Sequence, residues 1–451
     1  MTAIQQYKDL FKAHRELIDE NSCAVLNSVR DEAFEALEEV VFPKKGDEDY
    51  EVTDEESIFA PDYGINFRRM DLGVNPSEVF RCEVPNMSTS LFFLANDIFK
   101  SAANAYNGLP DGVIVKSLKA ASDDNKDLLT KYYGKVASLD NPQTAVNTLL
   151  AQDGLFMYIP KGVVVEKPIQ LVNILNSTVP LMVNRRILIV LEEGAQAKLL
   201  VCDHTQDREK DYLASQVVEI YAAENSVFDY YDIEDSSPNT NRVSSVYVHQ
   251  EEGSNVMIDG ITLRNGTTRN NYVVDMAGDH AELHLLGMAI VGEECHVDNH
   301  TVVNHSAKYG KTNELFKYVL DNKAIGAFSG LIRVEPGAVK TEAYQSNKNI
   351  CASDTARMYT KPQLLIDCDD VKCSHGSTIG QIDQNALFYM RSRGIPEKEA
   401  RLMLMQAFMH DVISGVRMES LKDRLRHLVE NRFLGNSASC AACQGKSGKN
   451  D

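Results

Sequence analysis

The sequence predicts a mainly β protein with α-helical flanks, and three observations support this prediction. From about Gly154 to about Asp370 the segments are short, rich in Val, Ile, Leu and Tyr, and bounded by Gly, Asn and Asp, as strands separated by turns are. No helical period is sustained there, whereas the segments before and after place apolar residues at helical spacing. Turn-like clusters also recur along the middle region. We therefore expect one long strand-rich core between two helical regions.

The recurring clusters favour a solenoid for this core. About 215 residues of strands without intervening helices can form a large sandwich, a barrel or a β-helix. Successive turn positions are separated by 31, 28 and 27 residues, intervals that suit one coil with two strand layers. These positions are Gly194, Asn225, Gly253 and His280, with Glu294 another 14 residues on. The alternative explanation is a coincidence among turn residues.

Residues 1–150 are expected to form an α-rich N-terminal domain. The segments "YKDLFKAHRELIDENS" and "AVLNSVRDEAFEALEEVVF" have apolar residues at helical spacing. A polar break follows them. The next apolar segment, "STSLFFLANDIFKSAANAY", is expected to be a further helix, with Ser88 or Thr89 as its N-cap.

The strand-rich core is expected to occupy residues 151–383, and a C-terminal helical domain residues 384–435. Pro396 suits the first turn of a helix, and Gly435 suits a helix C-cap. Two apolar stripes run along this region, so its main helix is expected to be covered on more than one side. Residues 436–451 have the composition of a flexible tail.

Composition and charge exclude several classes of function. The chain has 46 basic and 65 acidic residues, a formal net charge of −19, which argues against sequence-independent nucleic-acid binding and against binding to anionic membranes. No apolar run reaches the roughly 18–20 residues that span a bilayer. The first residues resemble neither a signal peptide nor a transit peptide, so a cytoplasmic location is expected. The nine cysteines are scattered, which favours free thiols in a reducing compartment.

Two constellations are candidate sites. In a strand, His296, Asp298 and His300 lie on one face, and such a row can hold zinc or iron; the alternative is a hydrogen-bonded polar ladder. Cys373 and His375, in "DDVKCSHGSTIGQID", also share one face of a strand, at the point where the strand-rich region ends. Spacing alone leaves open that this second pair is a buried thiol beside a core histidine.

Other motifs are weaker. Gly310–Thr312 and Gly445–Ser447 resemble the end of a phosphate-binding loop but lack its earlier glycine, so we do not expect the chain to be an ATPase. Cys440 and Cys443 form a single CxxC, whereas a closed zinc site needs four ligands; their role stays open. A β-helix enzyme acting on carbohydrate and a stand-alone metal-binding protein are the alternative functions.

A longer pattern resembles a known family. The segment "QLLIDCDDVKCSHGSTIGQIDQNALFYMRSRGIPEKEA" is similar to the signature of the SufB/SufD family of iron–sulfur cluster assembly proteins. The similarity extends over residues 140–415 and includes four further pieces: "GLFMYIPKGVVVEKPIQL", "HVDNHTVVNHSAKYGKTNELFKYVL", "GAFSGLIRV" and "KTEAYQSNKNI". The chain resembles the SufD members more than the SufB members, because Gly376 stands where SufB-like chains have a glutamate.

The resemblance implies a right-handed parallel β-helix core with helical domains at both ends. It implies a non-enzymatic scaffold subunit that pairs with a SufB-like paralogue through the β-helix, or with itself when isolated. A SufC-like ABC ATPase would dock on the C-terminal helices. On such a scaffold an iron–sulfur cluster is built and then passed to apo-proteins.

The resemblance also implies roles for individual residues. His375 matches the SufD histidine at the SufB interface, and Cys373 matches its neighbouring cysteine; both are reasonable iron ligands. The cluster would be transient and shared with the SufB-like partner, with none bound tightly by the isolated chain. One stripe of the C-terminal helix is expected to face the ATPase. Its candidate docking residues are Met405, Phe408, Met409 and Val412.

Overall fold

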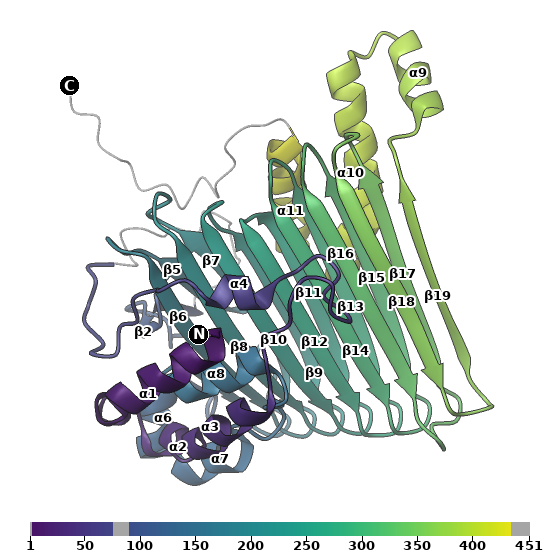
Figure 1. Cartoon of the computed structure of the whole chain (residues 1–451). Helices are drawn as coiled ribbons and strands as arrows, with labels where there is room; N and C mark the ends of the chain where they lie inside the picture. Colours follow the sequence, from purple (N-terminus) through teal and green to yellow (C-terminus); the bar gives the residue numbers. More distant parts are fainter. Residues whose placement is uncertain (1, 75–89, 434–451) are drawn as a thin grey trace.

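The strand-rich middle of the chain is a parallel β-solenoid (Figure 1). The structure, a computed structural model, describes residues 2–74 and 90–433. From β4 onward the chain passes back and forth between two sheets, so odd-numbered strands stack in one sheet, called the odd-numbered sheet, and even-numbered strands in the other, the even-numbered sheet; β2 lies in the former and β3 in the latter. This confirms the predicted mainly β fold with a solenoid core.

Within residues 2–74 and 90–433, the first sheet has ten strands and the second has nine. The first consists of β1 (Ser90–Ala95), β2 (Ile98–Ser101), β5 (Ile169–Leu175), β7 (Gln196–Thr205), β9 (Val227–Asp235), β11 (Asn255–Arg264), β13 (Glu282–Val291), β15 (Lys311–Leu320), β17 (Glu342–Cys351) and β19 (Lys372–Gly380). The second consists of β3 (Ile114–Ser117), β4 (Leu155–Ile159), β6 (Leu181–Leu191), β8 (Tyr212–Ala222), β10 (Thr240–Gln250), β12 (Thr267–Met276), β14 (His296–His305), β16 (Ile325–Val334) and β18 (Arg357–Ile366). All pairings are parallel except β1 with β2 and β3 with β4.

The recurring turn residues form a ladder along one edge of the solenoid. The four predicted positions have left-handed backbone, with φ of 66°, 57°, 64° and 60° for Gly194, Asn225, Gly253 and His280. The amide of each turn residue donates to a carbonyl in the next turn at 2.8–2.9 Å. The repeat is therefore the coil of the solenoid. A second row of turns runs along the opposite edge of the solenoid. There the left-handed residue is Glu293, one position before the expected Glu294.

One position in this ladder requires glycine for two reasons. Gly253 has φ +64°, and a Cβ there would lie 2.4 Å from Oδ1 of Asn225 in the preceding turn. Side chains rarely adopt this backbone conformation, and the stacked turn leaves no room for one.

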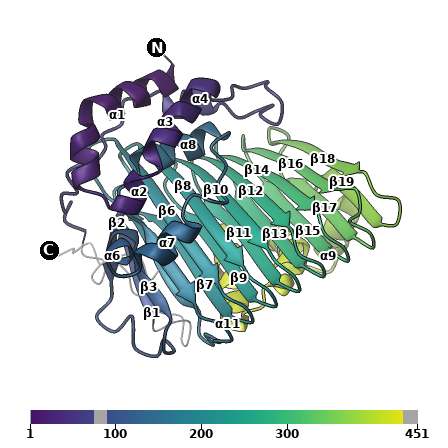
Figure 2. The ribbon, with the colours of Figure 1, turned by 90° about the horizontal axis from the view of Figure 1, so that it is seen from below.

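The N-terminal helices cover the outer face of the even-numbered sheet near its first coils. Outward side chains of β6, β8 and β10 (Met182, Leu213 and Val243) pack with four of these helices in one apolar cluster. The other three helices pack with outward side chains of β4 and β6 in a second cluster. The helices are α1 (Ala3–Glu20), α2 (Ala24–Asn27), α3 (Arg30–Glu39), α4 (Glu55–Phe59), α6 (Leu118–Asp124), α7 (Lys126–Tyr132) and α8 (Pro142–Leu150). Figure 2 shows them gathered at one end of the solenoid.

The prediction of a helix at residues 88–106 is wrong. This segment contains β1 and β2, and Ser88 and Thr89 lie outside the described residues. Nearly all of β1 is buried, because it pairs in parallel with β5 and begins the odd-numbered sheet. A fully buried strand has apolar residues on both faces, so its sequence does not alternate and resembles a buried helix.

An acidic N-terminal segment, residues 44–53, runs across the outer face of the even-numbered sheet. Oδ1 of Asp49 accepts from the hydroxyl of Ser329 on β16 at 2.7 Å and lies 3.1 Å from Nζ of Lys361 on β18. Asp49 also offers its backbone carbonyl to Arg269 on β12 at 2.9 Å. The segment therefore joins the N-terminal domain to the last coil.

Between β19 and residue 433, where the described part of the chain ends, lie three helices: α9 (Gln384–Ser392), α10 (Glu397–Gly415) and α11 (Glu419–Phe433). Helices α10 and α11 contact β11, β13 and β15 of the odd-numbered sheet, while Figure 1 shows α9 beyond the ends of the strands. Pro396 is the N-cap of α10, one position before the first turn. Gly435 and the expected tail lie outside the described residues. No helix in the described ranges is long and apolar enough to cross a membrane.

Candidate functional site at the open end of the solenoid

Cys373 and His375 lie on β19, the last strand of the odd-numbered sheet. In the parallel register Cys373 is opposite Ala343 and His375 is opposite Gln345. Ala343 and Gln345 are buried and face the interior between the two sheets. Because register partners in a sheet point to the same side, Cys373 and His375 share the inward face, as their spacing predicts.

The last coil is uncapped by the described residues. Strands β18 and β19 end their sheets and each pairs with only one neighbour, so each has a free row of backbone donors and acceptors. Large apolar side chains are exposed here at 40–51%. They are Tyr344, Tyr359, Leu365, Ile366 and Ile379. Exposed apolar side chains beside free strand edges are typical of an interaction surface.

The thiol at this end is partly shielded from solvent. Cys373 packs half-buried against the end of the solenoid core, as do Cys351 and Cys368. Burial, and then the neighbouring Cys368, raise the pKa of the Cys373 thiol, so it is protonated at neutral pH until a cation stabilises the thiolate. Residues 2–74 and 90–433 contain no group of three or more His, Cys, Asp or Glu placed to hold a metal ion.

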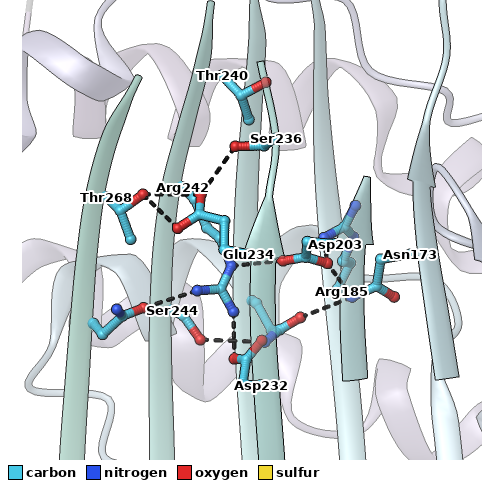
Figure 3. A network of polar contacts seen from close by, with 12 residues as sticks. Asn173, Arg185, Asp203, Asp232, Glu234, Ser236, Thr240, Arg242, Ser244 and Thr268 are labelled. Carbon is cyan, nitrogen blue, oxygen red and sulfur yellow. Dashed lines mark hydrogen bonds and ion pairs between the residues drawn. The ribbon is translucent and has the colours of Figure 1, made fainter. Parts of the chain in front are cut away.

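A buried ion network lies inside the solenoid, several coils before the open end (Figure 3). Arg242 on β10 pairs with Asp203 at 2.7 Å and with Asp232 at 2.5 Å, and Arg185 on β6 pairs with Asp203 at 2.8 Å. All four side chains are 5% exposed or less. Burial raises the pKa of the adjacent Glu234 to about 7 against the opposing effect of Arg242. Because these charges neutralise one another, we assign them to the stability of the fold.

The row His296, Asp298 and His300 points outward from β14, under the N-terminal segment. Asp298 pairs with Arg269 at 2.6 Å and accepts from the hydroxyl of Thr53 at 2.5 Å. That hydroxyl also lies 3.0 Å from Nε2 of His296. Burial, and then Arg269, lower the pKa of His300 to about 4. The row anchors the N-terminal segment, and metal binding by these residues stays a prediction.

The structure corrects part of the docking prediction for the C-terminal helix. Met409 and Val412 are 0–1% exposed and pack against outward side chains of the odd-numbered sheet. Met405 and Phe408 lie half-buried at the margin of the same cluster. Met409 and Val412 therefore belong to the core of the chain and are not free to meet an ATPase, while docking by Met405 and Phe408 stays a prediction.

Other apolar side chains in this region are exposed. Phe388 and Tyr389 on α9 are 73% and 59% exposed, and Met403 in the first half of α10 is 49% exposed. Met403 belongs to one of the two apolar stripes seen in the sequence, whereas Phe388 and Tyr389 precede both stripes. Helical periodicity does not tell which stripe faces the solenoid.

Comparison with known proteins gives the class to which this fold and site belong. A family model described as "SUF system FeS cluster assembly, SufBD core domain" matches residues 173–408. A second, "SufBD protein N-terminal region", matches residues 1–171. The chain belongs to the SufBD family of the SUF iron–sulfur cluster assembly system. This membership replaces the carbohydrate-active enzyme alternative, which rested on the β-helix alone.

Individual relatives are similar over most of their length. An iron–sulfur cluster assembly SufBD family protein of Synechocystis is 28% identical over 420 residues, which are 91% of this chain and 92% of the relative. The iron–sulfur cluster assembly protein SufD of Bacillus subtilis is 28% identical over an alignment that covers 71% of this chain and 74% of the relative. SufD of Escherichia coli is 28% identical over an alignment that covers 64% of this chain and 69% of the relative.

Proposed function

We propose that the chain is a SufD-like, non-enzymatic subunit of a cytoplasmic SufB–SufC–SufD scaffold. In this proposal it helps to build a nascent iron–sulfur cluster at the SufB/SufD interface, for transfer to apo-proteins and driven by a separate ATPase. The observation that carries the proposal is the position of Cys373 and His375, together on the inward face of an uncapped terminal strand. That surface meets whatever molecule covers the end of the solenoid.

A SufB-like paralogue is the partner that this end suits best. Another β-solenoid of the same family would offer strand edges and an apolar end of matching dimensions, and would bury the exposed side chains of β18 and β19. Imidazole and thiolate are ligands for iron–sulfur centres. A cysteine of the partner would complete the ligand set. When the chain is alone, two copies can use the same surface to form a homodimer.

The ABC-type ATPase would dock on the exposed side of the C-terminal helices. Exposed apolar side chains are available on these helices: Phe388 and Tyr389 on α9 and Met403 on α10, none of them in the cluster that packs on the solenoid. Aromatic residues and methionine are enriched in protein interfaces and carry much of their binding energy.

Replacing His375 with Ala is expected to abolish cluster assembly in the reconstituted complex while leaving the complex intact. The side chain is on the exposed terminal strand and carries no packing of the core, so only the ligand is lost. The measurement is the visible absorption and the iron and sulfide content of the complex after reconstitution, with co-elution as the check on assembly. His427→Ala, which removes an imidazole 75% exposed on α11, is the control. Undiminished assembly by His375→Ala would refute this role.

Phe388→Asp and Met403→Asp are each expected to weaken ATPase binding by about 10-fold or more, without changing the melting temperature. Met409→Asp, on the face of α10 that packs on the solenoid, is expected to destabilise the chain by about 3 kcal/mol or more, because it buries an unpaired charge. Binding is measured by titration with the purified ATPase, and stability by thermal unfolding. Full ATPase affinity in both exposed variants would exclude this docking surface.

A further inference from the structure

Three polar side chains lie in one row across the last strands of the odd-numbered sheet. Glu314 on β15 is opposite Gln345 on β17, and Gln345 is opposite His375 on β19. Glu314 and Gln345 are 3% exposed and face the interior of the solenoid. Since neighbouring strands are about 4.8 Å apart, the three side chains stand beside one another on the inward face.

Hydrogen bonds fix the orientation of the middle side chain. Nε2 of Gln345 donates to Oε2 of Glu314 at 2.9 Å. The same carboxylate oxygen accepts from the hydroxyl of Thr301 at 3.1 Å, which holds the carboxylate in place. Oε1 of Gln345 is buried and has no hydrogen-bond partner in the structure. A buried acceptor without a donor costs about 1–3 kcal/mol, so a donor that reaches this oxygen is stabilised.

The opposite sheet leaves room for this amide. Gly330 on β16 faces Gln345 across the interior, and a Cβ at Gly330 would lie 2.4 Å from Nε2 and 2.9 Å from Cδ of Gln345. No side chain fits there without moving the amide. The location of the Gln345 carboxamide is thus defined from two sides, by Glu314 within its own sheet and by the backbone of the facing strand.

We propose that Gln345 is a positioning residue for His375: when the exposed His375 side chain turns inward, its ring N–H donates to the carboxamide oxygen that has no partner in the structure, and Glu314 holds the amide in the orientation that makes this possible. A neutral imidazole has one N–H and one nitrogen with a lone pair. Fixing the N–H toward the interior leaves the lone pair directed away from it, toward the partner and the iron. Ligating histidines commonly donate their other N–H in this way. This inference rests on the proposed function of His375.

The orientation of the ring can be tested in the isolated full-length chain without iron. Nitrogen NMR of chain labelled in its histidines reports the tautomer of His375, which is assigned by its loss in His375→Ala. We expect one dominant tautomer in the unchanged chain and a mixture of both in Gln345→Leu and in Gly330→Ala, which displaces the amide without altering its chemistry. Asn347→Leu, the same loss of a buried amide one row further along β17, is the control and should keep one tautomer. An unchanged tautomer in Gln345→Leu would overturn the inference.

The consequence for iron is tested in the reconstituted complex. Loss of such a supporting hydrogen bond typically weakens metal binding by about 10- to 100-fold, so Gln345→Leu should retain iron that much less tightly against a chelator than Asn347→Leu. If His375→Ala leaves assembly intact while the NMR result holds, the positioning stands and the proposed function fails. If His375→Ala abolishes assembly while Gln345→Leu behaves as the unchanged chain in both measurements, the positioning fails and the proposed function stands.

Discussion

Replacing Arg242 with Met should lower the free energy of unfolding by about 3–5 kcal/mol, the usual cost of breaking a buried ion pair. Burial would raise the pKa of Asp203, but Arg185 and Arg242 hold it below its usual value. Without Arg242, Asp232 loses its ion-pair partner and Asp203 retains one arginine. Denaturant titration at neutral pH measures the loss.

The matched control is Arg426→Met. Arg426 also pairs with an aspartate, but its side chain is 49% exposed, and an exposed pair contributes about 0–1 kcal/mol. Adding Asp232→Asn to Arg242→Met should recover part of the stability, because it removes the stranded charge. A loss of less than about 1 kcal/mol in Arg242→Met would show that the network does not stabilise the solenoid.

Asp259→Asn is expected to stabilise the chain at neutral pH. Asp259 points outward from β11 into the apolar cluster beneath the C-terminal helices, between Met257 and Ile261. It is fully buried, and neither carboxylate oxygen has a hydrogen-bond partner. Burial alone raises the pKa of this carboxyl to about 7. An asparagine has nearly the same shape and no charge to bury.

The sign of the pH dependence follows from the raised pKa. In the unfolded chain an aspartate titrates near pH 4, so between about pH 4 and pH 7 the folded state holds a proton that the unfolded state has lost. Stability therefore falls as the pH rises through this window, by on the order of 4 kcal/mol for a shift of about three units. Asp259→Asn should remove this fall, which thermal unfolding at pH 5 and pH 8 would detect. Asp123→Asn, at an exposed aspartate of α6, should show no such difference; equal melting temperatures for Asp259→Asn and the unchanged chain at pH 8 would contradict the expectation.

Local patterns were sufficient to predict the coil of the solenoid. The backbone is left-handed at one turn residue in each of four successive coils, namely Gly194, Asn225, Gly253 and His280. Residues that tolerate this conformation are recognisable in a sequence. The shared face of Cys373 and His375 follows from strand geometry in the same way. In each case the chemistry of a short segment determines the conformation.

Features that depend on distant segments were not predictable. The buried pairs of Arg242 join side chains from both sheets, and a charged residue at an alternating position looks solvent-exposed in a sequence. Whether Met409 or Met403 faces the solenoid depends on how α10 packs, which the helical period leaves undetermined. Gln345 gains its significance only from its register with Glu314 and His375.

The bridge from Asp49 to Lys361 places a constraint on the order of events during synthesis. These residues are 312 positions apart, so the N-terminal segment cannot complete its contacts until nearly the whole solenoid has left the ribosome. Coils add one after another and each needs only its predecessor, whereas this bridge closes last and spans four coils at once. A chain that stops early would expose the acidic segment and an unfinished sheet edge together. Protease sensitivity of residues 44–53 in chains of increasing length would therefore report when the last coil is in place.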